Sequence, residues 1–322
     1  MNFRCCRTLS GATIRVVPRL GPATTGAALC VLSAAGFGTL GVFGRLAADA
    51  GADTTTTLAV RFALAALALT ALAAARGARV RTVPRAAVGR ALGLGAVGYS
   101  LQAGCYFAAL ARLDASLTAI VLYTYPAFVT VAALVLGRAA ADRRTFGALA
   151  TASLGLLLAL LGGGTSAFTL VGALLALAAS LTYTTYILVS DGVTRTVPPL
   201  VLAALVCAGA ALTTTAVGLA NGTLRLALPA DAWLWLVLIA LVSTVLPVTT
   251  FFAGLQRVGP SEAAILSTFE PPVTLVLAAL ALGERLAPVQ LAGGALVLAA
   301  AVALQMRPRA VSAAAPAAAG AR

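Results

Sequence analysis

The chain contains no histidine and no lysine, so all 22 of its basic residues are arginine. Without histidine, neither a Ser-His-Asp nor a Cys-His catalytic centre can be assembled. Charge of either sign is scarce, since 10% of the 322 residues are charged and only nine are acidic. These absences argue against a membrane enzyme, for which we would expect an interfacial cluster of acids or histidines.

Cysteine is also sparse, and the five cysteines form no framework. They are scattered over a basic N-terminal segment and separate apolar runs: Cys5, Cys6, Cys30, Cys105 and Cys207. With no histidine and no carboxylates nearby, this scatter predicts neither a metal site nor a disulfide. Residues 36–41 spell G-x-G-x-x-G, but they lie within an apolar run and follow no strand, so we expect no nucleotide cofactor.

Long apolar runs are what the sequence does have, with 61% hydrophobic residues and a mean hydropathy of +1.02. A helix of about 20 apolar residues crosses a hydrocarbon core of about 30 Å. Ten runs reach this length, with 145–190 counted twice because glycines interrupt it: 21–44, 54–75, 91–111, 115–137, 145–190, 196–224, 232–256, 263–283 and 286–306. We therefore predict an all-α integral membrane protein with ten transmembrane helices.

The chain also repeats itself. Residues 106–126 recur as residues 251–271, an interval of 145 residues, without a gap. Ten spans then give five per copy, and because five is odd the second copy must enter the membrane from the opposite side. We predict four segments: a basic cytoplasmic tail over 1–23, a first five-helix repeat over 24–162, a second over 163–306, and a disordered cytoplasmic tail over 307–322.

The arginines predict the orientation of the spans. With the N-terminus inside, seventeen arginines face the cytoplasm and four face outward, as the positive-inside rule requires. We expect a multi-pass protein of the cell inner (plasma) membrane, with both termini cytoplasmic and no cleavable signal. This arrangement explains the net charge of +13. The basic residues therefore indicate contact with the lipid bilayer, and no nucleic acid partner is expected.

Two charges interrupt the apolar runs, Arg61 in residues 54–75 and Glu270 in residues 263–283. A charge near the bilayer centre costs about 2.5 to 3.5 kcal/mol and normally faces the protein interior. Counted from opposite faces, both lie roughly 12 Å deep. Glu270 is a candidate for proton coupling or for binding a substrate amine, and Arg61 for binding a substrate carboxylate or tuning Glu270. The alternatives are a buried structural pair, or an Arg61 side chain that extends to a lipid headgroup.

Prolines interrupt two equivalent spans, at Pro126 and at Pro271 with Pro272. A proline has no N–H and displaces the carbonyl four residues earlier, here that of Leu122 or Ser267. Free carbonyls at this depth are tolerated only beside protein or a wet cavity. Because the copies are inverted, we expect Pro126 and Pro271 to face each other near mid-membrane, where they either line a cavity or kink helices for packing.

Aromatic and polar residues cluster in the same spans. The candidates for contact with a substrate are Tyr99, Gln102, Tyr123, Tyr125, Tyr183, Tyr186, Phe251 and Glu270. Tyrosine offers both a ring and a hydroxyl, which suits an amphipathic metabolite. The competing explanation is anchoring at the membrane interface. The copies differ at Tyr125 and Glu270, equivalent positions just before the prolines, so we expect function there first.

Four local motifs accompany this architecture: Arg61-Phe62, the stretch 108–126, the stretch 254–273 (GLQRVGPSEAAILSTFEPPV) and LGER at 282–285. Together with the ten spans, they resemble the EamA-type transporters of the drug/metabolite transporter superfamily. One departure is visible, because Gly137-Arg138 ends the fourth span where the resemblance favours Gly-Glu, as at Gly283-Glu284. The resemblance implies transport of small metabolites by alternating access, often with proton exchange.

The sequence therefore favours a secondary active transporter that exports a small-molecule substrate, with proton coupling. An amino acid or a derivative is the first substrate class, because one cation and one anion at similar depth suit a zwitterion. The alternatives are a multidrug efflux transporter, and a non-transporting membrane scaffold or lipid-handling protein. The sequence does not specify the oligomeric state.

Overall fold

The computed structural model of this chain describes residues 22–78, 83–137, 142–162, 169–194 and 197–306. Within these ranges the regular structure is helical throughout, without strands. The predicted basic tail over 1–23 and disordered tail over 307–322 lie outside the described residues, apart from residues 22 and 23.

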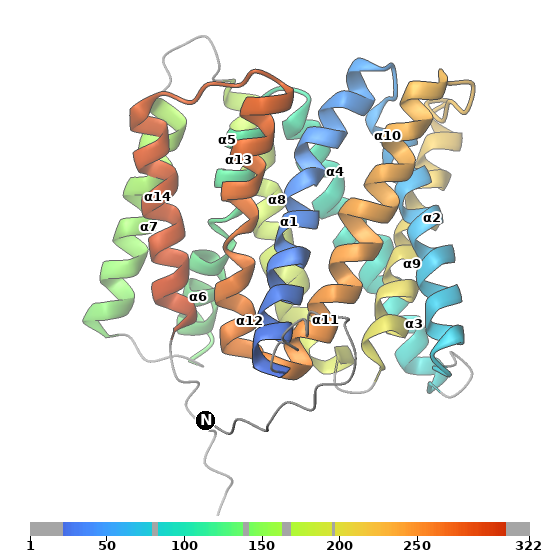
Figure 1. Cartoon of the computed structure of the whole chain (residues 1–322), viewed down its shortest axis with the longest axis horizontal. Coiled ribbons are helices and arrows are strands. Elements are labelled where there is room, and N and C mark those ends of the chain that lie inside the picture. The colour runs from blue at the N-terminus through green and yellow to red at the C-terminus, as the bar shows by residue number, and fades with distance from the viewer. Residues whose placement is uncertain (1–21, 79–82, 138–141, 163–168, 195–196, 307–322) are drawn as a thin grey trace, which may run out of the picture.

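The helices follow one another with short connections and run nearly parallel (Figure 1). Their bounds in chain order, with η marking π-helical turns, are α1 (Pro22–Asp49), α2 (Thr54–Ala75), α3 (Arg85–Gly93), η2 (Leu94–Tyr99), α4 (Ser100–Leu110), α5 (Ala115–Leu122), α6 (Tyr125–Val135), α7 (Arg143–Leu161), α8 (Leu170–Thr194), α9 (Pro199–Ala220), α10 (Ala230–Ala240), η3 (Leu241–Val245), α11 (Leu246–Val258), α12 (Pro260–Ser267), α13 (Glu270–Ala281) and α14 (Pro288–Gln305). The start of α1 and the end of α14 lie on the same side of the bundle, the lower side in Figure 1.

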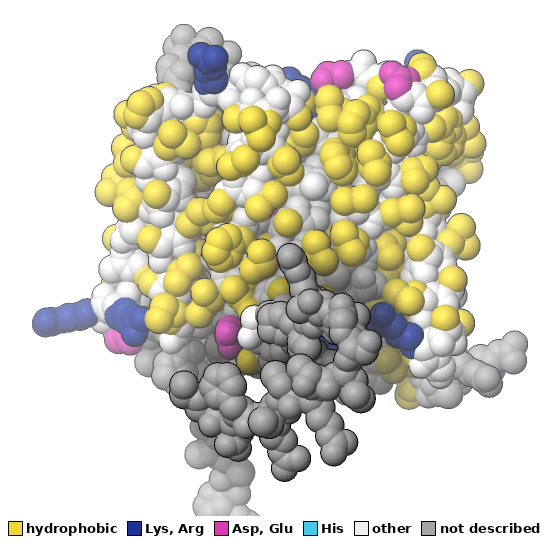
Figure 2. All heavy atoms as spheres, in the orientation of Figure 1, with side chains coloured by type: hydrophobic (Ala, Val, Ile, Leu, Met, Phe, Trp, Pro, Cys, Tyr) yellow, Lys and Arg dark blue, Asp and Glu magenta, His cyan; other side chains and the backbone are white. Residues whose placement is uncertain are grey.

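Nine helical segments of the described chain are long and apolar enough to cross a membrane, and each overlaps one of the expected runs. The tenth run, 91–111, lies in the helical stretch Arg85–Leu110, where glycines, tyrosines and Gln102 lower the hydropathy. Figure 2 shows hydrophobic side chains over the side of the bundle and charged side chains at its two ends. The all-helical membrane class is thus confirmed, and the count of ten spans stays a prediction.

The helix bounds reproduce the interval of 145 residues found in the sequence. Helices α2, α5, α6 and α7 begin 145 residues before α9, α12, α13 and α14 respectively. In Figure 1 the chain descends from α5 to α6 and ascends from α12 to α13, so these equivalent segments run in opposite directions. Both observations are those expected of an inverted duplication.

Equivalent helices start by different local chemistry. Asp53 caps α2 by accepting from the Thr56 N–H at 2.9 Å, and Asp142 caps α7 in the same way. Their counterparts α9 and α14 begin instead with prolines, Pro199 and Pro288. Carboxylates at the N-cap satisfy free N–H groups, whereas proline at the first position removes one. The two solutions place the helix starts at equivalent positions.

Glu284 joins the two halves of the molecule. Its carboxylate accepts from the Ala115 N–H at 2.8 Å and from the Ser116 N–H at 3.0 Å, and so satisfies the free donors at the start of α5. The equivalent start of α12 is Pro260, which has no N–H to donate.

Burial, and then the Glu284 carboxylate, raise the pKa of the neighbouring Asp114. The ionised form of Asp114 therefore opposes folding, and protonation at low pH relieves this cost.

Two glycines allow helices α3, η2 and α9 to cross at backbone contact. A Cβ added to Gly95 would overlap the carbonyl oxygen of Val206, and one added to Gly209 would overlap that of Leu92. Small residues at such crossings let transmembrane helices approach closely. This contact holds η2, and with it Tyr99, against α9.

Candidate functional site

The two proline-containing spans are each broken into two helices. Helix α5 ends at Leu122 before α6 begins at Tyr125, and α12 ends at Ser267 before α13 begins at Glu270. Pro126 and Pro271 are the second residues of α6 and α13, and both are buried. The breaks follow from proline chemistry, since the ring lacks an N–H and clashes with the carbonyl four residues earlier.

Each freed carbonyl is met by a hydroxyl from another part of the chain. Ser180 of α8 donates to the Leu122 carbonyl at 3.2 Å, and the Tyr123 phenol donates to the Ser267 carbonyl at 2.6 Å. The residue 145 positions before Ser180 is Ala35 of α1, which has no hydroxyl. The α12–α13 break therefore has no serine equivalent to Ser180. The hydroxyl of Tyr123 donates to its carbonyl instead.

The same phenol also contacts Glu270. The Tyr123 hydroxyl oxygen lies 3.0 Å from Glu270 Oε2. A phenol carries one hydrogen, and the Ser267 carbonyl can only accept. The phenol can share this hydrogen between the Ser267 carbonyl and Glu270 Oε2, or a protonated Glu270 can donate to the phenol oxygen and leave the hydrogen to Ser267. An ionised Glu270 competes with the Ser267 carbonyl for the single hydrogen of Tyr123.

Arg61 is buried, with 2% of its surface exposed, among neutral partners. Its Nε donates to Thr244 Oγ1 at 2.9 Å, and its Nη2 donates to the Tyr99 hydroxyl at 3.2 Å. The guanidinium also lies 5.0 Å from the centroid of the Phe62 ring, within cation–π distance. Within the described residues it forms no ion pair with Glu270. In this structure Arg61 neither pairs with Glu270 nor extends to a headgroup, because hydroxyls and rings hold it inside.

Both hydroxyl partners of Arg61 lie on π-helical turns at equivalent positions of the two copies. Tyr99 ends η2, Thr244 lies in η3, and they are 145 residues apart. Thr244 in turn donates to the Ile239 carbonyl at 2.9 Å, which leaves its oxygen free to accept from Arg61. Single π-helical turns occur often at functional sites. Sequence reasoning missed Thr244, and its repeat relationship to Tyr99 was the signal that could have found it.

Five tyrosine rings join the surroundings of Arg61 to those of Glu270. Neighbouring ring centroids are 4.8 to 6.2 Å apart, within the range of aromatic contacts. The order of the rings is Tyr99, Tyr186, Tyr183, Tyr125 and Tyr123. We call this row the tyrosine ladder. It has a cation hydrogen-bonded at one end and a carboxyl group at the other.

Three residues predicted for the site lie apart from the tyrosine ladder. Gln102 is buried in α4 and makes no hydrogen bond to a ladder hydroxyl in the described structure. The Phe251 ring packs against Phe252, its neighbour in α11, at 5.8 Å. Pro272 lines a groove on the outer surface beside α14. Among the described residues, no group of three His, Cys, Asp or Glu side chains is placed to hold a metal ion.

Comparisons with known proteins agree with this architecture. A curated protein of Bacillus subtilis (strain 168), "Uncharacterized transporter YcbK", is 30% identical over 211 residues, which cover 63% of this chain and 68% of that protein. A solved structure described only as "Crystal structure of protein" shares the fold, with a TM-score of 0.60 and 18% identity over 88% of this chain and 96% of its own. The EamA-like transporter family matches twice, over residues 24–161 and 170–306. The predicted resemblance is confirmed, and this multi-pass membrane protein belongs to the EamA-like transporter family.

Proposed function

We propose that this transporter exports a small zwitterion, an amino acid or a derivative, by alternating access coupled to proton movement. The observation that carries the proposal is the Tyr123 hydroxyl, which has a single hydrogen and lies 2.6 Å from the Ser267 carbonyl oxygen and 3.0 Å from Glu270 Oε2. In a membrane, an unsatisfied carbonyl costs several kcal/mol because no water replaces the lost partner. Binding or release of one proton at Glu270 therefore changes the hydrogen bonding of the α12–α13 break.

The proton step would act on a bistable element. With Glu270 protonated, the Tyr123 hydroxyl donates to the Ser267 carbonyl and stabilises the break in its present form. With Glu270 ionised, the phenol hydrogen is drawn to the carboxylate, and the Ser267 carbonyl needs another partner. The titratable groups that interact with Glu270 among the described residues are the hydroxyls of Tyr99, Tyr106, Tyr123, Tyr125 and Tyr183, none of which is a carboxylate. An outward-open and an inward-open form could thus differ at this break.

The tyrosine ladder supports a zwitterionic substrate. A substrate carboxylate would replace the Tyr99 hydroxyl as partner of Arg61, whose planar guanidinium suits bidentate binding. A substrate amine would bind ionised Glu270, and exchange of the amine for a proton gives the coupling. A multidrug efflux transporter would use Glu270 for cationic drugs and leave Arg61 in its present contacts. A scaffold or a lipid-handling protein would need neither residue.

The proposal includes the remaining predictions about topology. The transporter would have ten spans in two inverted repeats, divided near residues 162 and 163, with both termini in the cytoplasm and the inner (plasma) membrane as its location. The opposite directions of α5–α6 and α12–α13 in Figure 1 support the inversion. The positive-inside distribution of the arginines supports the orientation.

Transport by the purified protein in proteoliposomes tests the function. With an acidic lumen, an exporter that exchanges substrate for protons is expected to accumulate a labelled amino acid, and collapse of the pH gradient should stop this. Empty liposomes and cationic dyes serve as controls. Accumulation in vesicles with an alkaline lumen would instead indicate symport and contradict export. Gradient-driven accumulation of cationic dyes alone would favour multidrug efflux.

The role of the Tyr123 hydroxyl is tested by Tyr123→Phe. Loss of the donor leaves the Ser267 carbonyl unsatisfied, so we expect a loss of stability of about 1–3 kcal/mol, measured as a lower Tm in detergent. Tyr125→Phe is the matched control, because the Tyr125 hydroxyl makes no hydrogen bond within the described residues. Ala35→Ser in the Tyr123→Phe background should recover part of the loss by supplying the missing serine. Equal Tm values for the two phenylalanine variants would disprove the role.

A further inference from the structure

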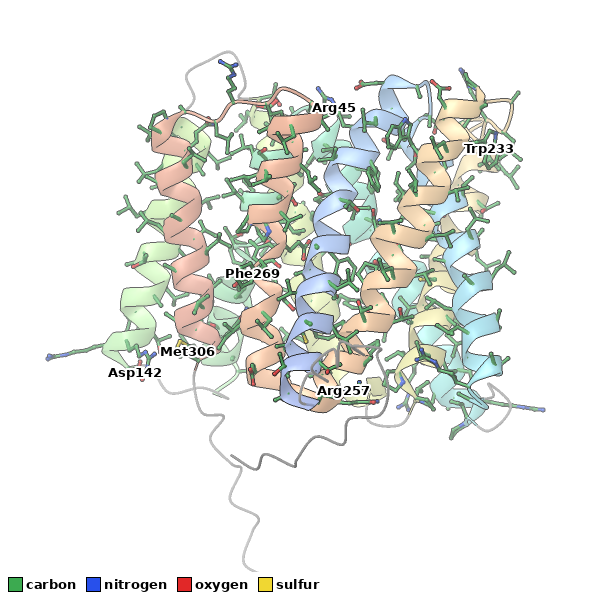
Figure 3. All side chains as sticks on the ribbon, in the orientation of Figure 1. Arg45, Asp142, Trp233, Arg257, Phe269 and Met306 are labelled. Atoms are coloured by element: carbon green, nitrogen blue, oxygen red, sulfur yellow. The ribbon has the colours of Figure 1, made fainter. Side chains whose placement is uncertain are left out.

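A groove separates α14 from the α12–α13 break on the outer surface. Helix α14 packs mainly on α7, and the two helices stand side by side at one edge of the bundle (Figure 1). The groove has a volume of about 520 Å³, and its lining includes Arg144, Phe269, Pro272, Leu298, Val302 and Met306. In Figure 3, Phe269 lies between the ribbons of α13 and α14, and Met306 lies at the end of α14.

The walls of this groove are apolar and face the bilayer. The Phe269 and Met306 side chains are 50% and 55% exposed, although they lie on helices that span the membrane. Water is absent at this depth, so hydrocarbon must fill the groove. From Leu298 to Met306 the groove follows α14 for eight residues, or roughly 12 Å at 1.5 Å per residue. One leaflet of a hydrocarbon core about 30 Å thick has nearly this depth, so the groove matches one acyl chain in length.

The guanidinium of Arg144 lies at the end of the groove where the headgroup of such a lipid would lie. Arg144 is in the first turn of α7, level with the end of α14, and its side chain is exposed. In the described structure its guanidinium donates no hydrogen bond and forms no ion pair. The adjacent Asp142 carboxylate is already engaged by the Thr145 N–H at 2.7 Å. A free guanidinium at the headgroup level attracts a phosphate with net negative charge.

We propose that this groove is a binding site for an anionic phospholipid. The phosphate binds Arg144, and one acyl chain lies along α14 between Leu298 and Phe269. The end of that chain contacts Phe269 and Pro272, which flank Glu270 in the sequence. The lipid thus packs against the broken span that carries Glu270, and its binding does not depend on the transport activity proposed above.

Native mass spectrometry of the delipidated full-length protein tests the site. The added probes are phosphatidylglycerol and phosphatidylcholine with identical acyl chains. We expect more phosphatidylglycerol to be retained, and Arg144→Gln to reduce this retention about fivefold, the effect of roughly 1 kcal/mol for one basic residue. Arg76→Gln is the matched control, because Arg76 is an exposed arginine at a helix end on the same side of the bundle and is not part of the lining of this groove. Ala299 also lines the groove, so Ala299→Trp should fill it and reduce the retention of both lipids.

The outcomes separate this site from nonspecific lipid contact. Thermal unfolding in detergent checks that each variant is folded before its lipid retention is compared. Equal phosphatidylglycerol retention by the wild type and Arg144→Gln would overturn the proposal. Unchanged retention of both lipids by Ala299→Trp would overturn it as well. A dimer that Ala299→Trp abolishes would show that a second copy of the chain, and not a lipid, occupies the groove.

Discussion

Glu270→Gln is expected to abolish proton-driven accumulation of substrate, a loss of at least about 100-fold, the lower end of what a positioned proton-transfer group contributes. Glutamine cannot exchange a proton. Its amide N–H can still donate to the Tyr123 oxygen, so the phenol keeps its hydrogen for the Ser267 carbonyl. The variant should therefore fold and resemble the protonated form. The measurement is uptake into proteoliposomes with an acidic lumen.

The control for this prediction is Glu262→Gln, which neutralises an exposed carboxylate of α12 eight residues earlier. This variant should accumulate substrate as the wild type does. Substrate binding, measured by thermal shift, should also weaken in Glu270→Gln, because the proposed partner of the amine is lost, and should be unchanged in Glu262→Gln. Full gradient-driven accumulation by Glu270→Gln would rule out Glu270 as the proton-coupling residue. Proton coupling would then have to use another group.

Gly95→Ala is expected to lower the free energy of unfolding by about 1–3 kcal/mol, the usual cost of overpacking. The added methyl group would overlap the Val206 carbonyl oxygen of α9. A backbone atom in a helix cannot turn aside as a side chain can, so η2 and α9 must separate. Since η2 carries Tyr99, the hydrogen bond from Arg61 should weaken too. Thermal unfolding in detergent and substrate affinity are the two measurements.

Gly104→Ala is the matched control, because Gly104 lies in α4 of the same helical stretch and an added Cβ would meet no atom within 4 Å. Alanine is favoured over glycine in a helix by up to about 1 kcal/mol, so this variant should be neutral or more stable. A Gly95→Ala protein as stable as Gly104→Ala would show that the α9 crossing is looser than the structure indicates.

The sequence predicted much of the helical framework because the signals for it are local. The apolar runs beginning at residues 115 and 263 locate the helix starts Ala115 and Pro260 within three residues, and the interval of 145 residues relates these two starts to each other. The prolines likewise predict where a span is interrupted, since the missing N–H and the ring clash act within four residues. Whether the interruption is a kink or a full break depends on partners elsewhere, here the hydroxyls of Ser180 and Tyr123.

The candidate site was predicted only in part. Of the six tyrosines, five form the tyrosine ladder, whereas Gln102 and Phe251, which were predicted with them, lie outside it. Arg61 and Glu270 were recognised because a charge within an apolar run is conspicuous. Their partners were not, because a threonine or a carbonyl within such a run carries no distinguishing mark in the sequence.

The sequence by itself determined the membrane class, the duplication and the family resemblance, because hydropathy and repetition are properties of the chain alone. Only the tertiary structure decided what Arg61 and Glu270 contact. Arg61 binds Thr244 across 183 residues, and Tyr123 reaches the Ser267 carbonyl across 144 residues. Such contacts depend on which helices pack together. They also require the donor and acceptor atoms to lie about 3 Å apart with the hydroxyl directed at the acceptor. For the same reason, the difference between Ala35 and its repeat equivalent Ser180 can be explained only from the structure, where Tyr123 donates to the carbonyl of the second break.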